Sequence, residues 1–482
     1  MNDEPPSKRL LPRLGCFGWG CVISAPPLLF AVVAFLIWSN GVSHDVQAKL
    51  AQIRAAGQPV TADELANAHL LPPNTPDGTR FWLTAIEPLD GEAFGAACAN
   101  LPLVGSGGDE IPPPGEPWPQ SDDARRLLEQ YAASLRGLHA AADDQGGVRF
   151  PLRFNDGIAM LVPHAQRLRG AARLLALEAH VKAHEGDATG AAESFHAGFA
   201  VARTIEHDPL LIVLLVRIAI DGMFREQLER LFSAVEFTDA DLARLRADLQ
   251  RAQYQGGLLQ AMYGERVIGL ATIQNPSKAV GNEAPLFSRL RLIHGNDTRC
   301  YLECMELVVA KAKLPLPQAF AGIKQLDADL AATMGASSPL SPAGNPMTKL
   351  LMPSLTGVFT AATRGTASNE TADAALAVEQ YRRRYGKLPE QLDELMPEFL
   401  QAVPDDAFDG QPLRYVVRAD GYVVYSVGQD LIDQGGLKGP IVNALSDPGD
   451  LTFEVKRGRK NIDNWEAAKG QEAAKGQNYF GK

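Results

Sequence analysis

The sequence predicts a mainly α-helical protein with an N-terminal transmembrane helix, a large helical body and a small α+β unit near its C-terminal end. An uncharged, strongly apolar run close to the N-terminus indicates the membrane helix. Apolar residues then recur at helical spacing through most of the chain, and alternating β-rich runs replace them only after residue 412. We therefore expect three parts, of which the helical body is the largest.

The composition is that of a globular chain, and it excludes one class of function. Of the 482 residues, 46% are hydrophobic and 21% are charged. The net charge is −11, and no basic stretch offers the positive face that a nucleic-acid-binding protein needs. We therefore expect no nucleic-acid partner.

Residues 14–39 have the properties of a transmembrane signal anchor. The segment CVISAPPLLFAVVAFLIW, residues 21–38, carries no charge and is long enough, as a helix, to cross a bilayer. Lys8, Arg9 and Arg13 precede it, and basic flanks stay in the cytoplasm. We expect residues 1–13 to be cytoplasmic and the bulk of the chain to be periplasmic, beyond the cytoplasmic (inner) membrane. A cleaved signal peptide and a buried helix of a soluble protein are the alternatives.

Residues 44–334 form the predicted helical body. Within it, residues 165–205 read as two amphipathic helices that break at Gly186 and Asp187. Small side chains at Ala179, Ala191 and Ala192 would let these two helices approach closely. The pair resembles a tetratricopeptide hairpin, although no repeat of about 34 residues recurs. The Gly- and Pro-rich segment 105–120 is expected to be an exposed loop.

Residues 347–457 form the predicted C-terminal unit, after the loop GASSPLSPAGNP at residues 335–346. Its long helix is expected to end at Tyr385, because Gly386 suits the position that follows a helix. The preceding arginines, Arg382, Arg383 and Arg384, suit the negative end of the helix dipole. We considered these arginines as a basic patch for an acidic ligand, but dipole pairing and solvation explain them better.

Three antiparallel strands should complete this unit. Residues 412–417, 422–428 and 450–455 are β-rich, and Asp420 and Gly421 between the first two form a hairpin signal. The remaining residues, 458–482, contain EAAKGQ twice and are expected to be a mobile tail.

Residues 375–436 carry an ordered set of motifs, in which Y-x-x-x-x-G-x-x-P is followed by D-x-F-x-G-x-P-x-x-Y, Y-S-x-G-x-D and a Gly pair. The matching positions are Tyr381, Gly386, Pro389, Asp406, Phe408, Gly410, Pro412, Tyr415, Tyr425, Ser426, Gly428, Asp430, Gly435 and Gly436. This set resembles the globular part of the major pseudopilins of type II secretion, with Ala407 where that family usually has proline. The whole chain also resembles uncharacterised planctomycete-type membrane-anchored proteins, which combine an anchor, a helical body and this C-terminal unit.

The resemblance to major pseudopilins implies a calcium site in the loop that follows the hairpin. Asp430 and Asp433 lie in the matching loop, and Asp447 and Asp450 are placed to complete the site from the next segment. Calcium binds several hard oxygen ligands, which carboxylates on a tight loop provide. Calcium is therefore the candidate cofactor, and the alternative is that these acids only solvate a turn.

Histidines and cysteines offer two further candidates. His180 and His184 share a helix face and, with His196, could bind zinc or copper, although a polar helix face explains them as well. The cysteines that follow the anchor are Cys98, Cys300 and Cys304. They can pack as small apolar residues, form a disulfide that includes Cys98, or act as a redox site.

These observations favour a membrane-anchored extracytoplasmic protein that is a non-catalytic scaffold or a protein-interaction module of the bacterial envelope. Its expected partners are the membrane and other proteins. One alternative is an envelope hydrolase built in the helical body. Another is a minor component of a secretion or pilus-like machine.

Overall fold

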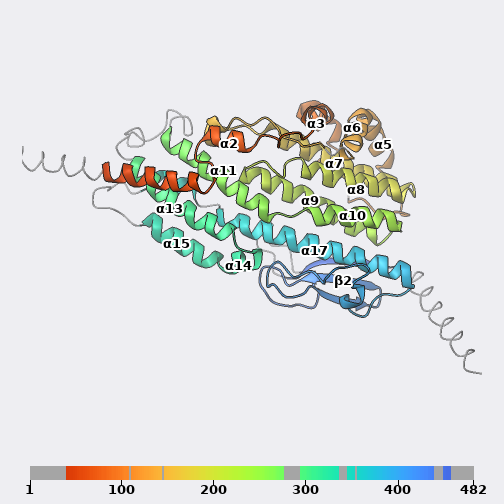
Figure 1. Ribbon diagram of the computed structural model, residues 1–482. Helices are drawn as coiled ribbons and strands as arrows, with labels where there is room; N and C mark the ends of the chain where they lie inside the picture. The colour runs from red at the N-terminus through yellow and green to blue at the C-terminus, as the bar shows by residue number, and fades with distance from the viewer. Residues whose placement is uncertain are drawn as a thin grey trace, which may run out of the picture.

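A computed structural model describes residues 40–107, 110–143, 146–275, 294–335, 345–352, 355–438 and 449–457. The protein is mainly helical, with a three-stranded antiparallel sheet near its C-terminal end, as the sequence predicts (Figure 1). The predicted cytoplasmic segment 1–13, the predicted anchor 14–39 and the predicted tail 458–482 lie outside the described residues. Among the described residues, no helix combines the length and the apolar character needed to cross a membrane.

Most of the chain consists of helices with short connections. Residues 40–55 are helical. They are followed by α2 (Ala62–Ala68), α3 (Thr79–Ile86), α4 (Gly91–Cys98), α5 (Ser121–Gln130), α6 (Ala132–Ala142), η1 (Phe154–Ala159), α7 (Pro163–His184), α8 (Ala188–Arg203), α9 (Leu211–Phe232), α10 (Asp239–Arg251) and α11 (Gln255–Gln274). The later elements are α13 (His294–Ala312), α14 (Leu316–Ala321), α15 (Ile323–Gly335), α16 (Pro346–Leu351), α17 (Leu355–Tyr385), η4 (Leu392–Leu395), β1 (Arg414–Arg418), β2 (Gly421–Ser426) and β3 (Leu451–Lys456).

Helices α7 to α10 form the centre of the body, and the shorter helices α3, α5 and α6 cover one side of it (Figure 1). The predicted break between α7 and α8 is confirmed, because Asp187 caps α8 by accepting a hydrogen bond from Gly190 N at 2.8 Å. The predicted small contact positions are confirmed too. Ala179, Ala191 and Ala192 are at most 1% exposed, so the two helices pack closely.

A second hydrophobic cluster lies where the described chain begins (Figure 1). It joins the helix at residues 40–55 to α11, α13, α15 and α16. Asp297 of α13, which is 3% exposed, holds α16 in place by accepting hydrogen bonds from Met347 N and Thr348 N at 2.9 Å each. The first turn of α16 thus takes its cap from another helix, because its own N-cap residue, Asn345, makes no side-chain cap hydrogen bond.

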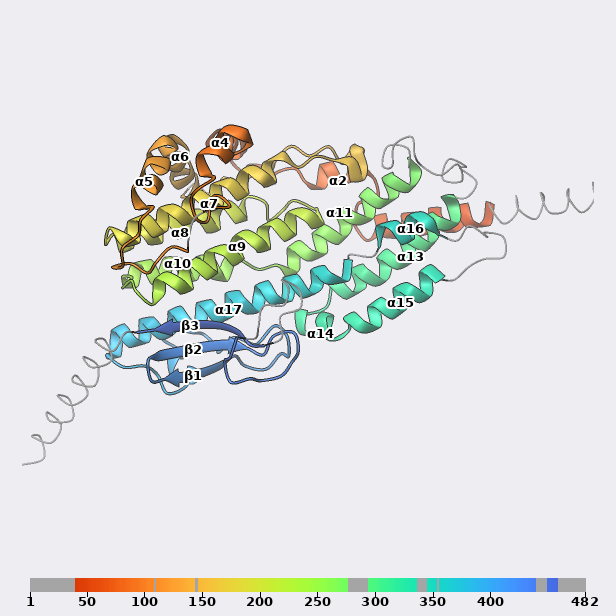
Figure 2. The ribbon, with the colours of Figure 1, turned by 180° about the vertical axis from the view of Figure 1, so that it is seen from behind.

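Helix α17 lies between the body and the sheet (Figure 2). It contacts α9 and α10 on one side and β2 and β3 on the other. The sheet has the order β1-β2-β3, and Tyr422 of β2 pairs with Val417 of β1 and Val455 of β3. As predicted, α17 ends at Tyr385, and Gly386 takes a φ of +70°, a conformation that glycine adopts without strain.

One hydrophobic core crosses the predicted boundary at residues 335–346. The cluster that contains the buried side chains of α7 to α10 also contains Leu376 and Val378 of α17. It continues into the sheet at Val424 and Val455. The predicted body and the predicted C-terminal unit therefore share one core.

The segment 105–120 differs from its prediction as an exposed loop. Ile111 and Trp118 are each only 6% exposed. The Trp118 ring lies 5.1 Å from the ring of His184, and the carbonyl oxygen of Pro112 lies 3.0 Å from His184 Nε2. The prediction is wrong at these positions because two large apolar side chains anchor the loop to the body.

Candidate functional site

A cleft of about 570 Å³ lies between α9, α17 and β3. Helix α9 forms one wall with some of the residues between Leu215 and Glu229, and α17 forms another with some of those between Thr360 and Thr371. Lys438 and residues 450–453, at the start of β3, close the third side. The cleft therefore forms where the helical body and the sheet meet.

Small side chains create the hollow. Ala219 and Gly222 of α9 face the cleft, as do Ala361 and Gly365 of α17. A Cβ atom on Gly365 would lie 2.6 Å from Cε2 of Tyr254, so this position admits only glycine while the Tyr254 ring stays in place. Larger residues at these positions would fill the space between the two helices.

The edge of β3 faces α9 and is only partly occupied. Glu229 accepts a hydrogen bond from Glu454 N at 2.8 Å, and Ser233 Oγ accepts one from Lys456 N at 3.0 Å. Backbone N–H groups alternate between the two sides of a strand, so the N–H of Thr452 points to the same side, which is the cleft. The hydroxyl oxygen of Thr452 is buried and has no hydrogen-bond partner among the described residues. Within the described part of the chain, nothing pairs with this short stretch of strand edge, which leaves it to a ligand.

Charged groups of both signs surround this edge. Lys438 Nζ lies 2.9 Å from Glu229 Oε1. Burial raises the pKa of the Asp450 carboxyl, and hydrogen bonds from Gly436 N and Gln434 N oppose that rise. On the opposite wall, Arg225 donates hydrogen bonds to Asn369 Oδ1 and to the Tyr254 hydroxyl. The cleft can therefore accept a polar ligand that carries both donors and acceptors.

A buried carboxyl group, that of Asp221, lies close to Arg225 beneath the surface of the cleft. Tyr254 is 0% exposed, and its hydroxyl donates a hydrogen bond of 2.8 Å to Asp221, which is 1% exposed. Burial raises the pKa of Asp221, and the nearby charges of Arg217 and Arg225 oppose that rise. This buried pair lies next to Arg225, which donates a hydrogen bond of 3.4 Å to the Tyr254 hydroxyl.

Three of the predicted calcium ligands accept hydrogen bonds from nearby backbone and side-chain groups, and one of them, Asp450, lines the cleft. Asp430 accepts hydrogen bonds from Ile432 N and from the side chain of Gln434, and Asp433 accepts them from Gly435 N and the Tyr425 hydroxyl. Asp450 accepts hydrogen bonds from Gln434 N and Gly436 N. The fourth predicted ligand, Asp447, lies outside the described residues. No group of three or more His, Cys, Asp or Glu side chains with the geometry of a metal site occurs in the described part of the chain.

The three predicted metal-binding histidines have separate partners. His180 Nε2 lies 2.9 Å from Gln227 Oε1, and burial lowers the pKa of His180 to about 4. His196 Nδ1 lies 2.7 Å from Asp248 Oδ2, and His184 contacts the loop at Pro112. The structure does not bring the three rings together, so the metal hypothesis is wrong for this set.

The cysteines pack as small apolar residues. Cys98, Cys300 and Cys304 are buried and free, and Cys98 belongs to a different hydrophobic cluster from the other two. Burial raises the pKa of the Cys98 thiol to about 11. The alternative of a disulfide that includes Cys98 is therefore wrong in this structure.

Ser194, Glu178 and His139 form a polar cluster with the residue types of a serine hydrolase, but the glutamate, and not the histidine, lies next to the serine. Glu178 lies between Ser194, whose Oγ donates a hydrogen bond of 2.7 Å to it, and His139, whose Nε2 is also 2.7 Å away. A catalytic serine needs the histidine next to it, to take its proton. Ser194 is also 0% exposed, and Lys182, which reaches it at 3.1 Å, already pairs with Glu178. This group stabilises the contact between α6, α7 and α8.

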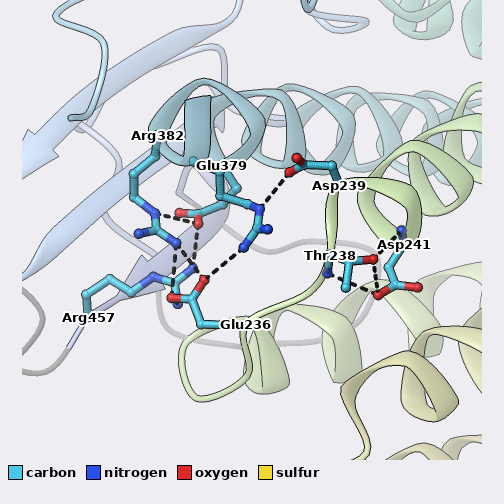
Figure 3. A network of polar contacts seen from close by, with 8 residues as sticks. Glu236, Thr238, Asp239, Asp241, Glu379, Arg382 and Arg457 are labelled. Atoms are coloured by element: carbon cyan, nitrogen blue, oxygen red, sulfur yellow. Dashed lines mark hydrogen bonds and ion pairs between the residues drawn. The ribbon is translucent and has the colours of Figure 1, made fainter. Parts of the chain in front are cut away.

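The arginines at the end of α17 form ion pairs within the protein (Figure 3). Arg382 binds Glu379 and Glu236, each at 2.8 Å, and Arg383 binds Asp239 at 2.6 Å. Arg457 reaches the same two glutamates, at 2.6 Å from Glu379 and 2.9 Å from Glu236. These contacts tie the end of α17 and the residue after β3 to the connection between α9 and α10. The arginines are therefore a structural joint.

The cleft between α9, α17 and β3 was not predicted from the sequence. Its only local signal is the pair of small residues at i and i+4 on α17, Ala361 and Gly365, and a similar pair at i and i+3 on α9, Ala219 and Gly222. Such pairs also occur wherever two helices pack closely. They indicate a cleft only once it is known that the sheet covers them.

Comparison of the chain with protein-family models, with curated proteins and with solved structures gave no match. The resemblance of residues 375–436 to major pseudopilins remains an expectation from their motifs. The structure shows a mainly helical chain with a small three-stranded antiparallel sheet near its C-terminal end.

Proposed function

We propose that the protein is a single-pass membrane protein of the bacterial envelope, whose periplasmic part binds a segment of a partner protein without catalysing a reaction. The anchor in this proposal derives from the apolar sequence of residues 14–39. The binding function derives from the cleft between α9, α17 and β3. The observation that carries it is the edge of β3 at Thr452, which no described residue pairs with, next to the two edge positions that Glu229 and Ser233 occupy.

An extended peptide segment fits the chemistry of this cleft. Its backbone can pair with the strand edge at Thr452, as peptides do when they add to a sheet. Its polar side chains can reach the hydroxyls of Ser368 and Thr371, and its apolar side chains can pack on Ile218 and Phe453. A cleft of about 570 Å³ accommodates a few residues, so the segment would be short.

The geometry favours this function over the two alternatives. For a hydrolase in the helical body, the arrangement of Ser194, Glu178 and His139 provides no nucleophile beside a base. For a component of a secretion or pilus-like machine, support comes only from the motifs in residues 375–436.

Site-specific crosslinking tests the proposal. A photoreactive amino acid replaces Ala361, which lines the cleft, or Glu129, which is exposed on α5, in the full chain in its native membrane. Mass spectrometry should find one defined segment of one protein crosslinked at position 361 and absent at position 129. Crosslinks to many unrelated segments at position 361 would contradict the proposal.

A matched pair of variants then tests the identified segment as a synthetic peptide. Gly222→Leu fills the cleft, where the nearest atom to a new Cβ is the flexible end of Arg225, and Gly95→Leu places the same side chain in open space on α4. The peptide should bind the first variant at least tenfold more weakly, on the order of 1.4 kcal/mol, and bind the second as it binds the natural protein. Equal affinity for Gly222→Leu would show that the segment binds elsewhere.

A further inference from the structure

A second cavity, of about 370 Å³, lies between the helix at residues 40–55, α11 and α13. It shares no lining residue with the cleft between α9, α17 and β3. Its walls combine apolar side chains, such as Ile53, Leu302 and Val309, with the cations Lys49, Arg266 and Lys313.

Arg266 is the unusual member of this set, because its charge is buried and is not balanced by an acid. The residue is 3% exposed. Its guanidinium donates hydrogen bonds to Gln58 Oε1 at 2.8 Å and to the carbonyl oxygen of Pro59 at 3.1 Å, and it lies 5.2 Å from the centre of the Tyr263 ring. Each of these partners is neutral. The third guanidinium nitrogen, Nε, is buried and has no partner among the described residues.

The two nearby glutamates are engaged elsewhere. Glu306, at the rim of the cavity, pairs with Lys49 at 2.8 Å. Glu265 is next to Arg266 in sequence, but its carboxyl accepts a hydrogen bond from Leu211 N, at the start of α9. Within the described part of the chain, Arg266 thus has no carboxylate as an ion-pair partner. A buried guanidinium stays protonated and favours an anion at its free donor.

We infer that this cavity binds an aliphatic carboxylate, with the carboxylate group at Nε of Arg266 and the aliphatic chain against Ile53, Leu302 and Val309. One guanidinium nitrogen without a partner, on a single buried cation, suits a group with one negative charge. Lys313, exposed at the rim and without an ion pair among the described residues, adds attraction for the same charge. The apolar wall selects a ligand with a hydrocarbon part over a small inorganic anion.

Calorimetric titration with octanoate tests this inference on the full chain, held in nanodiscs of zwitterionic lipid with empty nanodiscs as the blank. Two other probes separate the features of the ligand, since octanamide keeps the chain without the charge and inorganic phosphate keeps a charge without the chain. Octanoate should bind at one site and at least tenfold more tightly than either probe. Equal binding of octanamide, or tighter binding of phosphate, would overturn the inference.

Three variants locate the site. Arg266→Gln removes the charge and should weaken octanoate binding at least tenfold. Ala310→Phe leaves Arg266 unchanged but places a ring at the exposed rim of the cavity, and it should weaken binding by a similar factor. Lys324→Gln, on the exposed face of α15, serves as the control and should bind like the natural protein. If Ala310→Phe folds normally by circular dichroism and binds octanoate unchanged, the cavity is not the site.

Discussion

Glu370 of α17 should make the stability of the protein depend on pH. Burial raises the pKa of its carboxyl to about 8, and the charges of Asp406, Asp405 and Asp373 add to the rise. Asp373 is paired with Arg246 at 2.7 Å, and Asp406 is paired with Arg414 at 2.9 Å. Among the described residues, Glu370 has no such cation, and its Oε2 is buried without a hydrogen-bond partner.

The sign of the effect follows from the direction of the shift. The pKa in the folded protein, about 8, lies above the ordinary value of 4.5, so the folded state holds the proton more tightly than the unfolded state. The stabilising contribution of Glu370 is therefore complete below pH 4.5 and is lost as the pH rises to about 8. The rise in pKa from 4.5 to about 8 corresponds to a change of at most about 5 kcal/mol in the free energy of unfolding. Relaxation of the protein around the charged carboxylate should reduce this change to about 2–3 kcal/mol.

The substitution Glu370→Gln should remove this dependence, because glutamine resembles the protonated acid. Urea unfolding followed by circular dichroism, in a non-ionic detergent and at constant ionic strength, measures the free energy of unfolding from pH 5 to pH 9. The variant should be more stable than the natural protein by less than about 1 kcal/mol near pH 5 and by about 2 kcal/mol or more at pH 9. Glu129→Gln, on the exposed face of α5, is the control and should leave the curve unchanged. Parallel curves for the natural protein and Glu370→Gln would refute the reasoning.

Three other substitutions or reactions test the described contacts. Glu379→Gln leaves Arg382 and Arg457 without their buried carboxylate, so urea unfolding should show a loss of about 3 kcal/mol in the free energy of unfolding. The control Arg384→Gln, at a side chain that is 70% exposed, should change that free energy by less than about 0.5 kcal/mol. Asp297→Ala removes the acceptor for Met347 N and Thr348 N, so it should lower the free energy of unfolding by about 2 kcal/mol and speed limited proteolysis near α16. The control Asp329→Ala, on α15, should have neither effect. Iodoacetamide at pH 8 should modify Cys98 at least about 100-fold more slowly in the folded protein than in urea, because burial raises the pKa of the thiol and blocks access, and equal rates would contradict the described packing.

Local signals in the sequence predicted the elements well. The break at Gly186 and Asp187 and the end of α17 at Gly386 depend on backbone conformations and caps that a few neighbouring residues determine. The hairpin at Asp420 and Gly421 was predicted for the same reason, and its strands pair as expected. In each case the physical cause lies within a few residues along the chain.

Features that depend on distant residues were not predictable. Ile111 and Trp118 appear in a Gly- and Pro-rich loop, and only the body beneath them makes them anchors. The high pKa of Glu370 requires the turn that carries Asp405 and Asp406 to lie against α17. That turn follows Glu370 by about 35 residues in the chain. The cleft likewise needs α9, α17 and β3 together, although Thr452 looks like any strand residue in the sequence. The calcium prediction relied on the resemblance of this loop to that of major pseudopilins, and the structure shows Asp430 and Asp433 as acceptors for nearby backbone N–H groups.

The position of α17 links stability to the proposed binding function. Its middle forms one wall of the cleft, and its end is held to the α9–α10 connection through Glu379, Glu236 and two arginines. A partner segment in the cleft would touch α9, α17 and β3 at once, so it would bind only the assembled arrangement. A segment present at 100 times its dissociation constant would add about 2.7 kcal/mol to the stability of that arrangement. This gain in the free energy of unfolding is close to the loss expected for Glu379→Gln, so adding the segment should restore most of the stability of that variant. It should not do so in a protein that also carries Gly222→Leu, because the binding that supplies the stability is then lost.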